Sequence, residues 1–260
     1  MAPESPLQEP SLPAAASAPA PESFPYLEVI DSCGPHFEGA CLNARSGPGS
    51  SFASVMKLRT GMVLATATTT VIDASGRTWH KVVFNEWVRY PERVEGDWYV
   101  ESGYVRSFED PGTQEYELPV QDLLAQAKQG FGLDSEEKRI VVDRSDQKLY
   151  AYEGKELFLE ASVSTGLDLT PTPRGTFRVF KKTPSRYMQG PLPGISDQYY
   201  DLPGVPWNLY FTEEGGAIHG AYWHAEFGEQ WSHGCVNLPP ETAKALYAWT
   251  PLGTEVLVRD

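Results

Sequence analysis

Two short stretches near the C-terminus carry the residues on which the fold and the chemistry depend. Ala217–His224 reads AIHGAYWH, and Ser232–Leu238 reads SHGCVNL. They place Cys235 two positions after His233 and sixteen positions after His219. A thiol is mostly protonated at neutral pH, and an imidazole can accept its proton, so the cysteine and one of these histidines are a candidate nucleophile and base.

Spacing alone does not decide which histidine would act as the base. On a β-strand, His233 and Cys235 would point to the same face, because side chains alternate with a period of two. His219 would reach the cysteine from an adjacent strand. Both histidines therefore remain candidates at this point.

Strand patterns fill the sequence before these stretches. Ile140–Val142 and Leu149–Tyr152 flank polar turn residues and predict a hairpin. Further strands are predicted over Leu157–Val163, Thr176–Phe180 and Val256–Val258. A late helix is predicted where Pro240 suits the first turn and Pro251 follows the end. Its apolar residues at helical spacing are Ala243, Leu246 and Tyr247.

The pair His219-Gly220 followed by Ser232–Asn237 resembles the signature of the L,D-transpeptidases. Their YkuD-type catalytic domain has a histidine, a dozen or more residues, and then Ser/Thr-His-Gly-Cys with Asn or Arg two positions beyond. The resemblance covers residues 138–260 and implies a mixed β-sandwich with one late helix. The whole chain is therefore expected to be mainly β.

The resemblance implies a role for each residue of the motif. Cys235 would be the nucleophile and His219 the base, and the backbone carbonyl of Gly220 would hold the imidazole tautomer. His233 and Asn237 would shape the site. No metal and no cofactor are implied.

The same resemblance implies an oxyanion hole made by backbone N–H groups near Gly234 and Cys235. Ser232 is expected to hydrogen-bond the turn. Some members use a tyrosine hydroxyl in the oxyanion hole, and the sequence does not choose between Tyr210 and Tyr222. Trp223 and Trp231 are expected to form core or cleft wall.

The implied reaction is acyl transfer on peptidoglycan stem peptides. The Cys235 thiolate would attack the carbonyl of the third residue of a tetrapeptide stem, release D-Ala, and pass the acyl group to an amine of a second stem as a 3→3 cross-link. Water or a lipoprotein lysine as acceptor would make a carboxypeptidase or an anchoring enzyme. Carbapenem-type inhibitors are expected to capture the cysteine. Residues 183–205 are expected to form a loop or lid over the cleft.

The N-terminal part has a different organisation. Residues 1–24 are crowded with Pro, Ala and Ser and are expected to be a disordered stalk. Short strands over 25–109 predict a small antiparallel barrel. Leu42–Gly49 and Gly103–Val105 within it resemble a bacterial SH3-like domain, a family that binds cell-wall peptide or positions a catalytic neighbour. Residues 110–137 are expected to be a linker with a short helix at Val120–Lys128.

Composition limits the partners and suggests the compartment. The 21 Lys and Arg against 35 Asp and Glu give a net charge of −14, which disfavours nucleic acid and anionic lipid. No apolar run is long enough to span a membrane, so membrane contact is expected only through a missing N-terminal signal or lipid anchor. Cys33 and Cys41 are expected to form a disulfide, which fits an exported protein of the periplasm or cell envelope.

Two other enzyme classes fit the sequence less well. His219, His224, His233 and Cys235 can be counted as zinc ligands, but neither a later cysteine pair nor a His-Glu-x-x-His motif is present. Ser54-Val55-Met56-Lys57 is formally Ser-x-x-Lys, yet it lies among predicted strands and has no Lys-Thr-Gly partner.

A cell-wall-binding module without catalysis is the alternative outside the enzymes. Cys235 would then be a small buried apolar residue, as many free cysteines are. Thiol alkylation would separate the two, because a buried structural cysteine is inert.

Overall fold

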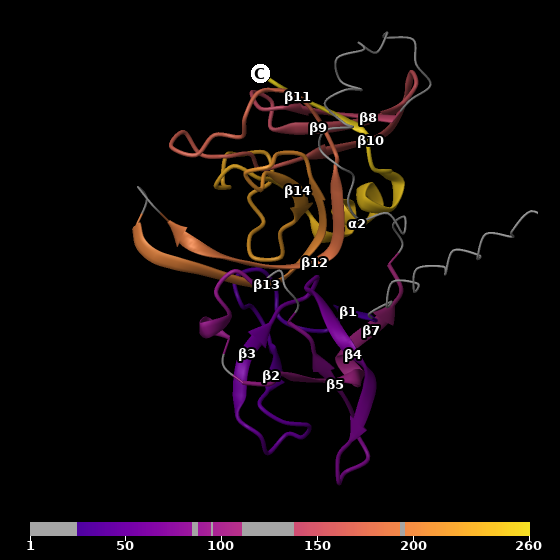
Figure 1. The fold of residues 1–260 in the computed structure, drawn as a ribbon, viewed down its shortest axis with the longest axis vertical. Helices are drawn as coiled ribbons and strands as arrows, with labels where there is room; N and C mark the ends of the chain where they lie inside the picture. The colour runs from indigo at the N-terminus through magenta and orange to yellow at the C-terminus, as the bar shows by residue number, and fades with distance from the viewer. Residues whose placement is uncertain (1–24, 85–87, 95, 111–137, 193–195) are drawn as a thin grey trace, which may run out of the picture.

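The computed structural model describes residues 25–84, 88–94, 96–110, 138–192 and 196–260. The chain forms a lower lobe from its N-terminal strands and an upper lobe from its C-terminal strands (Figure 1). The expected stalk over 1–24 and the expected helix at Val120–Lys128 lie outside the described residues. None of the described helices has the length and apolar character needed to cross a membrane.

The lower lobe is one seven-stranded sheet, called here the N-terminal sheet, in the order β3-β2-β6-β5-β4-β1-β7. Its strands are β1 (Tyr26–Val29), β2 (Leu42–Arg45), β3 (Ser54–Leu58), β4 (Val63–Ile72), β5 (Thr78–Val82), β6 (Tyr99–Glu101) and β7 (Val105–Phe108). Two 3₁₀ turns, η1 (Pro91–Arg93) and η2 (Ser102–Tyr104), interrupt the strand sequence.

The prediction of a closed barrel was wrong. After η2 the chain pairs β7 with the outer edge of β1, so β3 and β7 end at opposite edges of the described sheet. The SH3-like assignment itself stays a prediction. Within this lobe Cys33 and Cys41 form a disulfide, which leaves Cys235 as the free cysteine.

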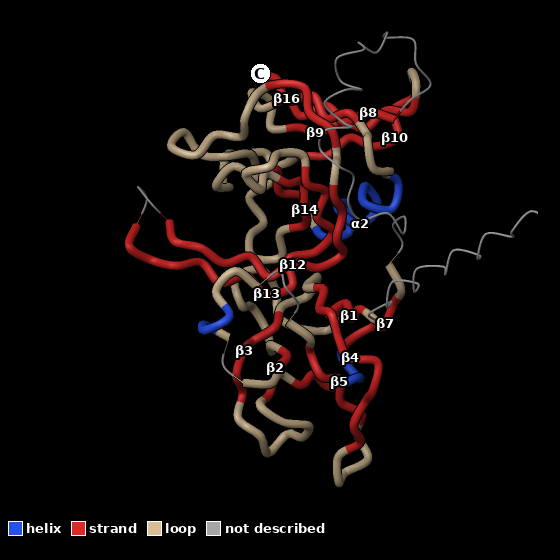
Figure 2. Tube along the Cα trace, viewed as in Figure 1, coloured by secondary structure: helices blue, strands red, loops and turns tan. Residues whose placement is uncertain are grey.

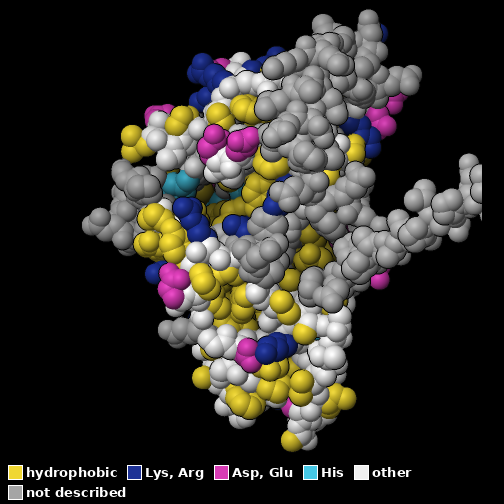
Figure 3. Space-filling model, viewed as in Figure 1, with side chains coloured by type: hydrophobic (Ala, Val, Ile, Leu, Met, Phe, Trp, Pro, Cys, Tyr) yellow, Lys and Arg dark blue, Asp and Glu magenta, His cyan; other side chains and the backbone are white. Residues whose placement is uncertain are grey.

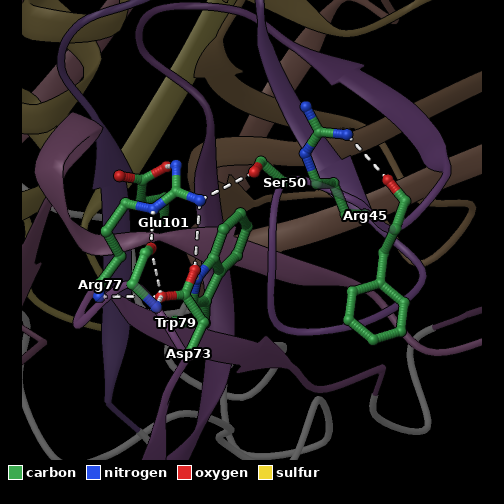
Figure 4. A network of polar contacts seen from close by, with 8 residues as sticks. Arg45, Ser50, Asp73, Arg77, Trp79 and Glu101 are labelled. Atoms are coloured by element: carbon green, nitrogen blue, oxygen red, sulfur yellow. Dashed lines mark hydrogen bonds and ion pairs between the residues drawn. The ribbon is translucent and has the colours of Figure 1, made fainter.

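A polar network braces the turn between β4 and β5 (Figure 4). The Asp73 carboxylate accepts hydrogen bonds from the Ser75 hydroxyl and the Trp79 indole N–H. The bond from Ser75 makes the largest contribution, and together these bonds hold the pKa of Asp73 well below its ordinary value. Arg77 extends the network to Ser50 and Glu101, so β5, β6 and the loop after β2 are tied together.

The upper lobe contains two mixed sheets. The first has the order β10-β9-β8-β16-β11 and the second the order β12-β13-β14-β15. The first consists of β8 (Lys138–Asp143), β9 (Lys148–Glu153), β10 (Glu156–Ser162), β11 (Gly175–Arg178) and β16 (Glu255–Arg259), and the second of β12 (Lys181–Leu192), β13 (Ser196–Tyr210), β14 (Ala217–Gly220) and β15 (Val236–Leu238). The expected hairpin at Ile140–Tyr152 is formed by β8 and β9.

One α-helix, α2 (Pro240–Trp249), is described in the upper lobe, where the late helix was expected. It buries Ala243, Leu246 and Tyr247 in a core with residues of both sheets, such as Ile140 and Trp207. Burial of apolar side chains on this scale is the main stabilising contribution to the lobe.

In the stretch expected to be a loop, the described residues 183–192 and 196–205 form strands instead. β12 and β13 pair along a hairpin that projects from the upper lobe and lies across the top of the N-terminal sheet (Figures 1 and 2). We call residues 186–192 and 196–205 of this hairpin the arm. Bulges between Arg186 and Met188 and between Pro191 and Leu192 accommodate prolines that normally disfavour a strand.

Candidate active site

A cavity of about 880 Å³ lies between the arm, the turn before β14 and the turn before β15. Its lining includes most of the residues singled out by the motif: His219, Trp223, Ser232, His233, Gly234, Cys235 and Asn237. Figure 3 shows histidine side chains at the molecular surface beside apolar groups, on the side where the arm projects. The cavity is large enough for a peptide-sized ligand.

The parallel pairing of β14 and β15 brings His219 and Cys235 to one face. His219 is the register partner of Asn237, and Ile218 is the partner of Val236. Ile218 and Val236 are buried in the core of the lobe, so the alternate residues face the cavity. Cys235 directly precedes β15 and lines this cavity together with His219.

The His219 ring is buried and has a defined tautomer. Its Nδ1–H donates a hydrogen bond of 3.0 Å to the carbonyl oxygen of Gly220, which leaves Nε2 unprotonated in the neutral ring. Burial lowers the pKa of His219 to about 4, against the opposing effect of the Gly220 carbonyl. The imidazole is therefore a neutral proton acceptor at physiological pH.

Gly220 is required at its position by close packing. A Cβ there would lie 2.7 Å from Pro206 Cγ and 3.1 Å from the Cα of Pro240. Any larger residue would push β14 away from α2, and the carbonyl that holds His219 would move with it.

The Cys235 thiol is partly exposed in the cavity. Its Sγ lies 3.9 Å from the carbonyl oxygen of Gly215. Burial raises the pKa of Cys235 above its ordinary value, while the Ala217 backbone N–H partly opposes this shift. The resting cysteine is therefore a neutral thiol, and a base must remove its proton during attack.

Ser232 braces the turn that presents the cysteine. Its hydroxyl donates to the carbonyl oxygen of Cys235 at 2.5 Å and accepts from the Gly234 N–H at 3.2 Å. Gly234 has φ = +118°, a conformation that L side chains rarely adopt. The Gly234 N–H, which the resemblance assigned to an oxyanion hole, is thus bonded to Ser232 in this structure.

His233 lies at the cavity wall beside Tyr200, which the sequence did not single out. The two rings are parallel within 8°, with centroids 6.4 Å apart. Burial, followed by the proximity of Cys235, raises the pKa of Tyr200. Tyr200 lies in the Pro-, Gly- and Tyr-rich stretch expected to form a lid. The composition of that stretch is the sequence feature that could have indicated Tyr200 as a residue of the site.

Asn237 faces the cavity and contacts His224 on its other side. The Nδ1 of His224 accepts the Glu226 N–H, and burial lowers the pKa of His224 to about 4. The Asn237 amide nitrogen lies 2.9 Å from His224 Nε2, within hydrogen-bond distance. Asn237 therefore links the cavity floor to a neutral His224.

Tyr222 does not lie at the cavity, contrary to the expectation for this residue. It is buried, its hydroxyl donates to the carbonyl oxygen of Pro203 at 2.6 Å, and Arg59 lies over its ring. The turn after β14 directs this side chain toward the N-terminal sheet. Trp223, in contrast, lines the cavity with its ring centroid 5.8 Å from that of His219.

Two charged side chains border the cavity. Glu214 belongs to the tight turn before β14, which is closed by the Gly216 N–H bond to the Thr212 hydroxyl. Arg174 lines another part of the cavity and pairs with Asp260. Within the described ranges, no group of three or more His, Cys, Asp and Glu side chains is arranged to hold a metal ion.

The family model described as the L,D-transpeptidase catalytic domain, YkuD, matches residues 137–258. This part of the chain is therefore an L,D-transpeptidase catalytic domain. No curated protein matches the sequence significantly.

Several solved structures are similar to the chain. The Ldtfm-avibactam carbamoyl enzyme is 31% identical, with 48% of this chain and 50% of that chain covered and a TM-score of 0.44. The catalytic domain of an E. faecium L,D-transpeptidase is 32% identical, with coverages of 48% and 98% and a TM-score of 0.42. L,D-transpeptidase 3 from Mycobacterium tuberculosis in complex with a faropenem-derived adduct is 24% identical, with coverages of 47% and 60% and a TM-score of 0.44. The chain thus spans half the length of the first of these structures.

Proposed function

We propose that the protein is a peptidoglycan L,D-transpeptidase in which Cys235 is the nucleophile and His219 the base. The observation that carries the proposal is the His219 ring itself. Its Nδ1–H is held by the Gly220 carbonyl, and it lines the same cavity as the cysteine. A neutral imidazole with a free Nε2 is the group needed to deprotonate a neutral thiol.

In the first half-reaction, His219 Nε2 takes the thiol proton as Sγ forms a bond to the carbonyl carbon of the third stem residue. The tetrahedral adduct collapses, the amide C–N bond breaks, and the leaving D-Ala amine takes the proton from His219. A thioester on Cys235 remains. Splitting the reaction through a covalent intermediate is the usual advantage of a cysteine nucleophile.

In the second half-reaction, an amine of another stem attacks the thioester and gives its proton to His219. The C–S bond breaks, and the thiolate recovers the proton. Glu214 at the cavity border supports an amine acceptor, because a carboxylate attracts an ammonium group. Water as acceptor would give an L,D-carboxypeptidase, and a lipoprotein lysine would give an anchoring enzyme.

We also propose that the protein works in the cell envelope, since the Cys33–Cys41 disulfide suits an oxidising compartment. Similar structures include complexes with imipenem and a faropenem-derived adduct. A covalent adduct with a carbapenem is therefore expected on Cys235.

The test is incubation with disaccharide-tetrapeptide, followed by mass spectrometry for loss of D-Ala and for dimers. The parent is expected to form dimers, whereas Cys235→Ala and His219→Ala should form none while remaining folded. Hydrolysis without dimers would favour the carboxypeptidase. No turnover by the parent, together with wall binding retained in Cys235→Ala, would favour a binding module.

A further inference from the structure

The arm presents different residues to its two sides. Gln189 and Asp201 are register partners, and Gly190 and Tyr200 are the next pair along the hairpin. Because strand side chains alternate, the first pair points away from the second. Tyr200 faces the cavity, and Asp201 faces η1 of the N-terminal sheet.

On the side of the N-terminal sheet, Arg93 holds the two residues that flank Tyr200. Its Nε and Nη2 donate to Asp201 Oδ2 at 3.0 and 2.6 Å. Its guanidinium carbon also lies 4.5 Å from the centroid of the Tyr199 ring. Arg93 is the last residue of η1, which lies beneath the arm (Figure 2).

Gln189 adds a second contact to the same segment. Its amide oxygen accepts the Tyr90 N–H at 3.0 Å, and its amide nitrogen donates to Asp201 Oδ1 at 2.9 Å. Gln189 is only 3% exposed, so this link is protected from solvent. Both oxygens of Asp201 are thus held, one by each partner.

On the cavity side, Tyr200 has little freedom to move independently of the arm. A Cβ on Gly190 would lie 2.8 Å from the Tyr200 hydroxyl, so the ring crosses the hairpin directly over this glycine. The ring is also parallel within 8° to that of His233, with centroids 6.4 Å apart. A shift of the arm would therefore carry Tyr200 away from His233, two residues from the nucleophile.

We propose that Arg93 is a positioning residue for the transpeptidase site, acting from the N-terminal sheet through Asp201 to set the place of Tyr200. The proposal rests on the function proposed above. The N-terminal lobe would then fix one wall of the cavity through the arm, without lining the cavity itself, as well as packing against the upper lobe.

The central variant is Arg93→Ala, with Arg93→Lys as the conservative variant and Arg93→Asp combined with Asp201→Arg as a charge exchange. Lys81→Ala is the matched control. It breaks the ion pair between Lys81 of β5 and Asp97, whose cation is as exposed as Arg93 (41% against 40%) and which includes no residue of the arm. Circular dichroism and thermal unfolding would verify that each variant folds.

Two readouts separate positioning from general stability. With the tetrapeptide substrate, Arg93→Ala is expected to lower kcat/KM by about tenfold, the size of effect that small misplacements produce, with partial recovery in Arg93→Lys and in the charge exchange. The reaction of Cys235 with the bulky disulfide reagent DTNB, which requires no transpeptidase activity, should become about fivefold faster as the arm loosens. Lys81→Ala should change neither quantity.

The outcomes distinguish this inference from the proposed function. If the parent turns over and Arg93→Ala has the parent's kcat/KM and DTNB rate, the positioning role is refuted and the ion pair is a surface contact without effect. If the parent lacks turnover, the proposed function fails, and the DTNB rates alone decide whether Arg93 holds the arm. Loss of activity equal in Arg93→Ala and Lys81→Ala would also overturn the proposal.

Discussion

Lys244 of α2 donates a hydrogen bond of 2.7 Å to the carboxylate of Glu28 on β1, so this ion pair joins the transpeptidase domain to the N-terminal sheet. Arg106 of β7 contacts the same carboxylate oxygen at 2.7 Å. Glu28 is 3% exposed. Burial alone would raise the pKa of Glu28, but the bonds from Lys244 and Arg106 lower it below its ordinary value.

Replacement of Glu28 by Gln is expected to lower the free energy of unfolding by about 1–3 kcal/mol, because two charged donors lose a buried carboxylate and keep only a neutral amide oxygen as acceptor. Urea unfolding at pH 7 measures this. Since the folded pKa is depressed, the contribution is present above the ordinary glutamate pKa and is lost as the pH falls through the folded value. Glu160→Gln, at an exposed pair with Lys148, should cost less than about 1 kcal/mol. Equal effects of the two substitutions would contradict the prediction.

The pKa directions of Cys235 and His219 predict how the thiol reacts with iodoacetamide. Burial raises the pKa of Cys235 and lowers that of His219 to about 4, so no thiolate and imidazolium pair exists at rest. Alkylation should therefore be slow at pH 6 and rise only above the ordinary thiol pKa of about 8.5. Mass spectrometry of the alkylated protein gives the rates, with Cys235→Ala as the control for other sites. Rapid alkylation at pH 6 would show that the ion pair is preformed.

Ser232→Ala should disturb the nucleophile without unfolding the domain. The hydroxyl that bridges the Gly234 N–H and the Cys235 carbonyl would be lost, so the turn could relax and displace Sγ. We expect kcat to fall by about tenfold or more, as positional errors near a reacting atom produce. Ser232→Thr keeps the hydroxyl and should retain most of the activity. Identical kcat values for the parent and the Ala variant would rule out the bracing role.

The buried ammonium group of Lys182 should make the free energy of unfolding depend on pH in the alkaline range. Its buried Nζ donates to the carbonyl oxygens of Tyr247 and Thr250 at the end of α2, and burial lowers its pKa to about 8. An unfolded lysine keeps a pKa of about 10.4, so between these values the unfolded state binds more protons and stability rises with pH.

The comparison variant is Lys182→Met, whose side chain does not titrate. Urea unfolding at pH 8, 9 and 10 should show that the parent gains stability relative to the Met variant as the pH rises. Parallel curves for the two proteins would mean that Lys182 titrates normally.

Local patterns predicted the upper lobe well where they were regular. The hairpin at Ile140–Tyr152 and the helix after Pro239 follow from alternation, turn residues and proline placement, and β8, β9 and α2 confirm them. The placement of His219 beside the cysteine needed more than this. It depends on the parallel register of β14 and β15, which spacing along the chain does not encode.

The arm and Tyr222 show where sequence reasoning failed. Pro191, Pro203 and neighbouring glycines indicated a loop, but bulges and contacts with the N-terminal sheet hold these residues in strands. Tyr222 is close to His219 in sequence, yet the turn between them sends its ring to the opposite side. Both errors arise from packing between segments that are distant in the sequence. The same packing places Tyr200 at the cavity, which the sequence alone did not predict.

The two lobes share one apolar interior between them. Tyr187 and Val205 of the arm, together with Tyr222, pack with Met62 and Leu64 of the N-terminal sheet in one buried cluster. A proteolytic fragment that begins at Lys138 would expose this surface to water and is expected to self-associate. Exchanging the N-terminal strands for those of another protein would therefore require redesign of the arm as well as of the junction.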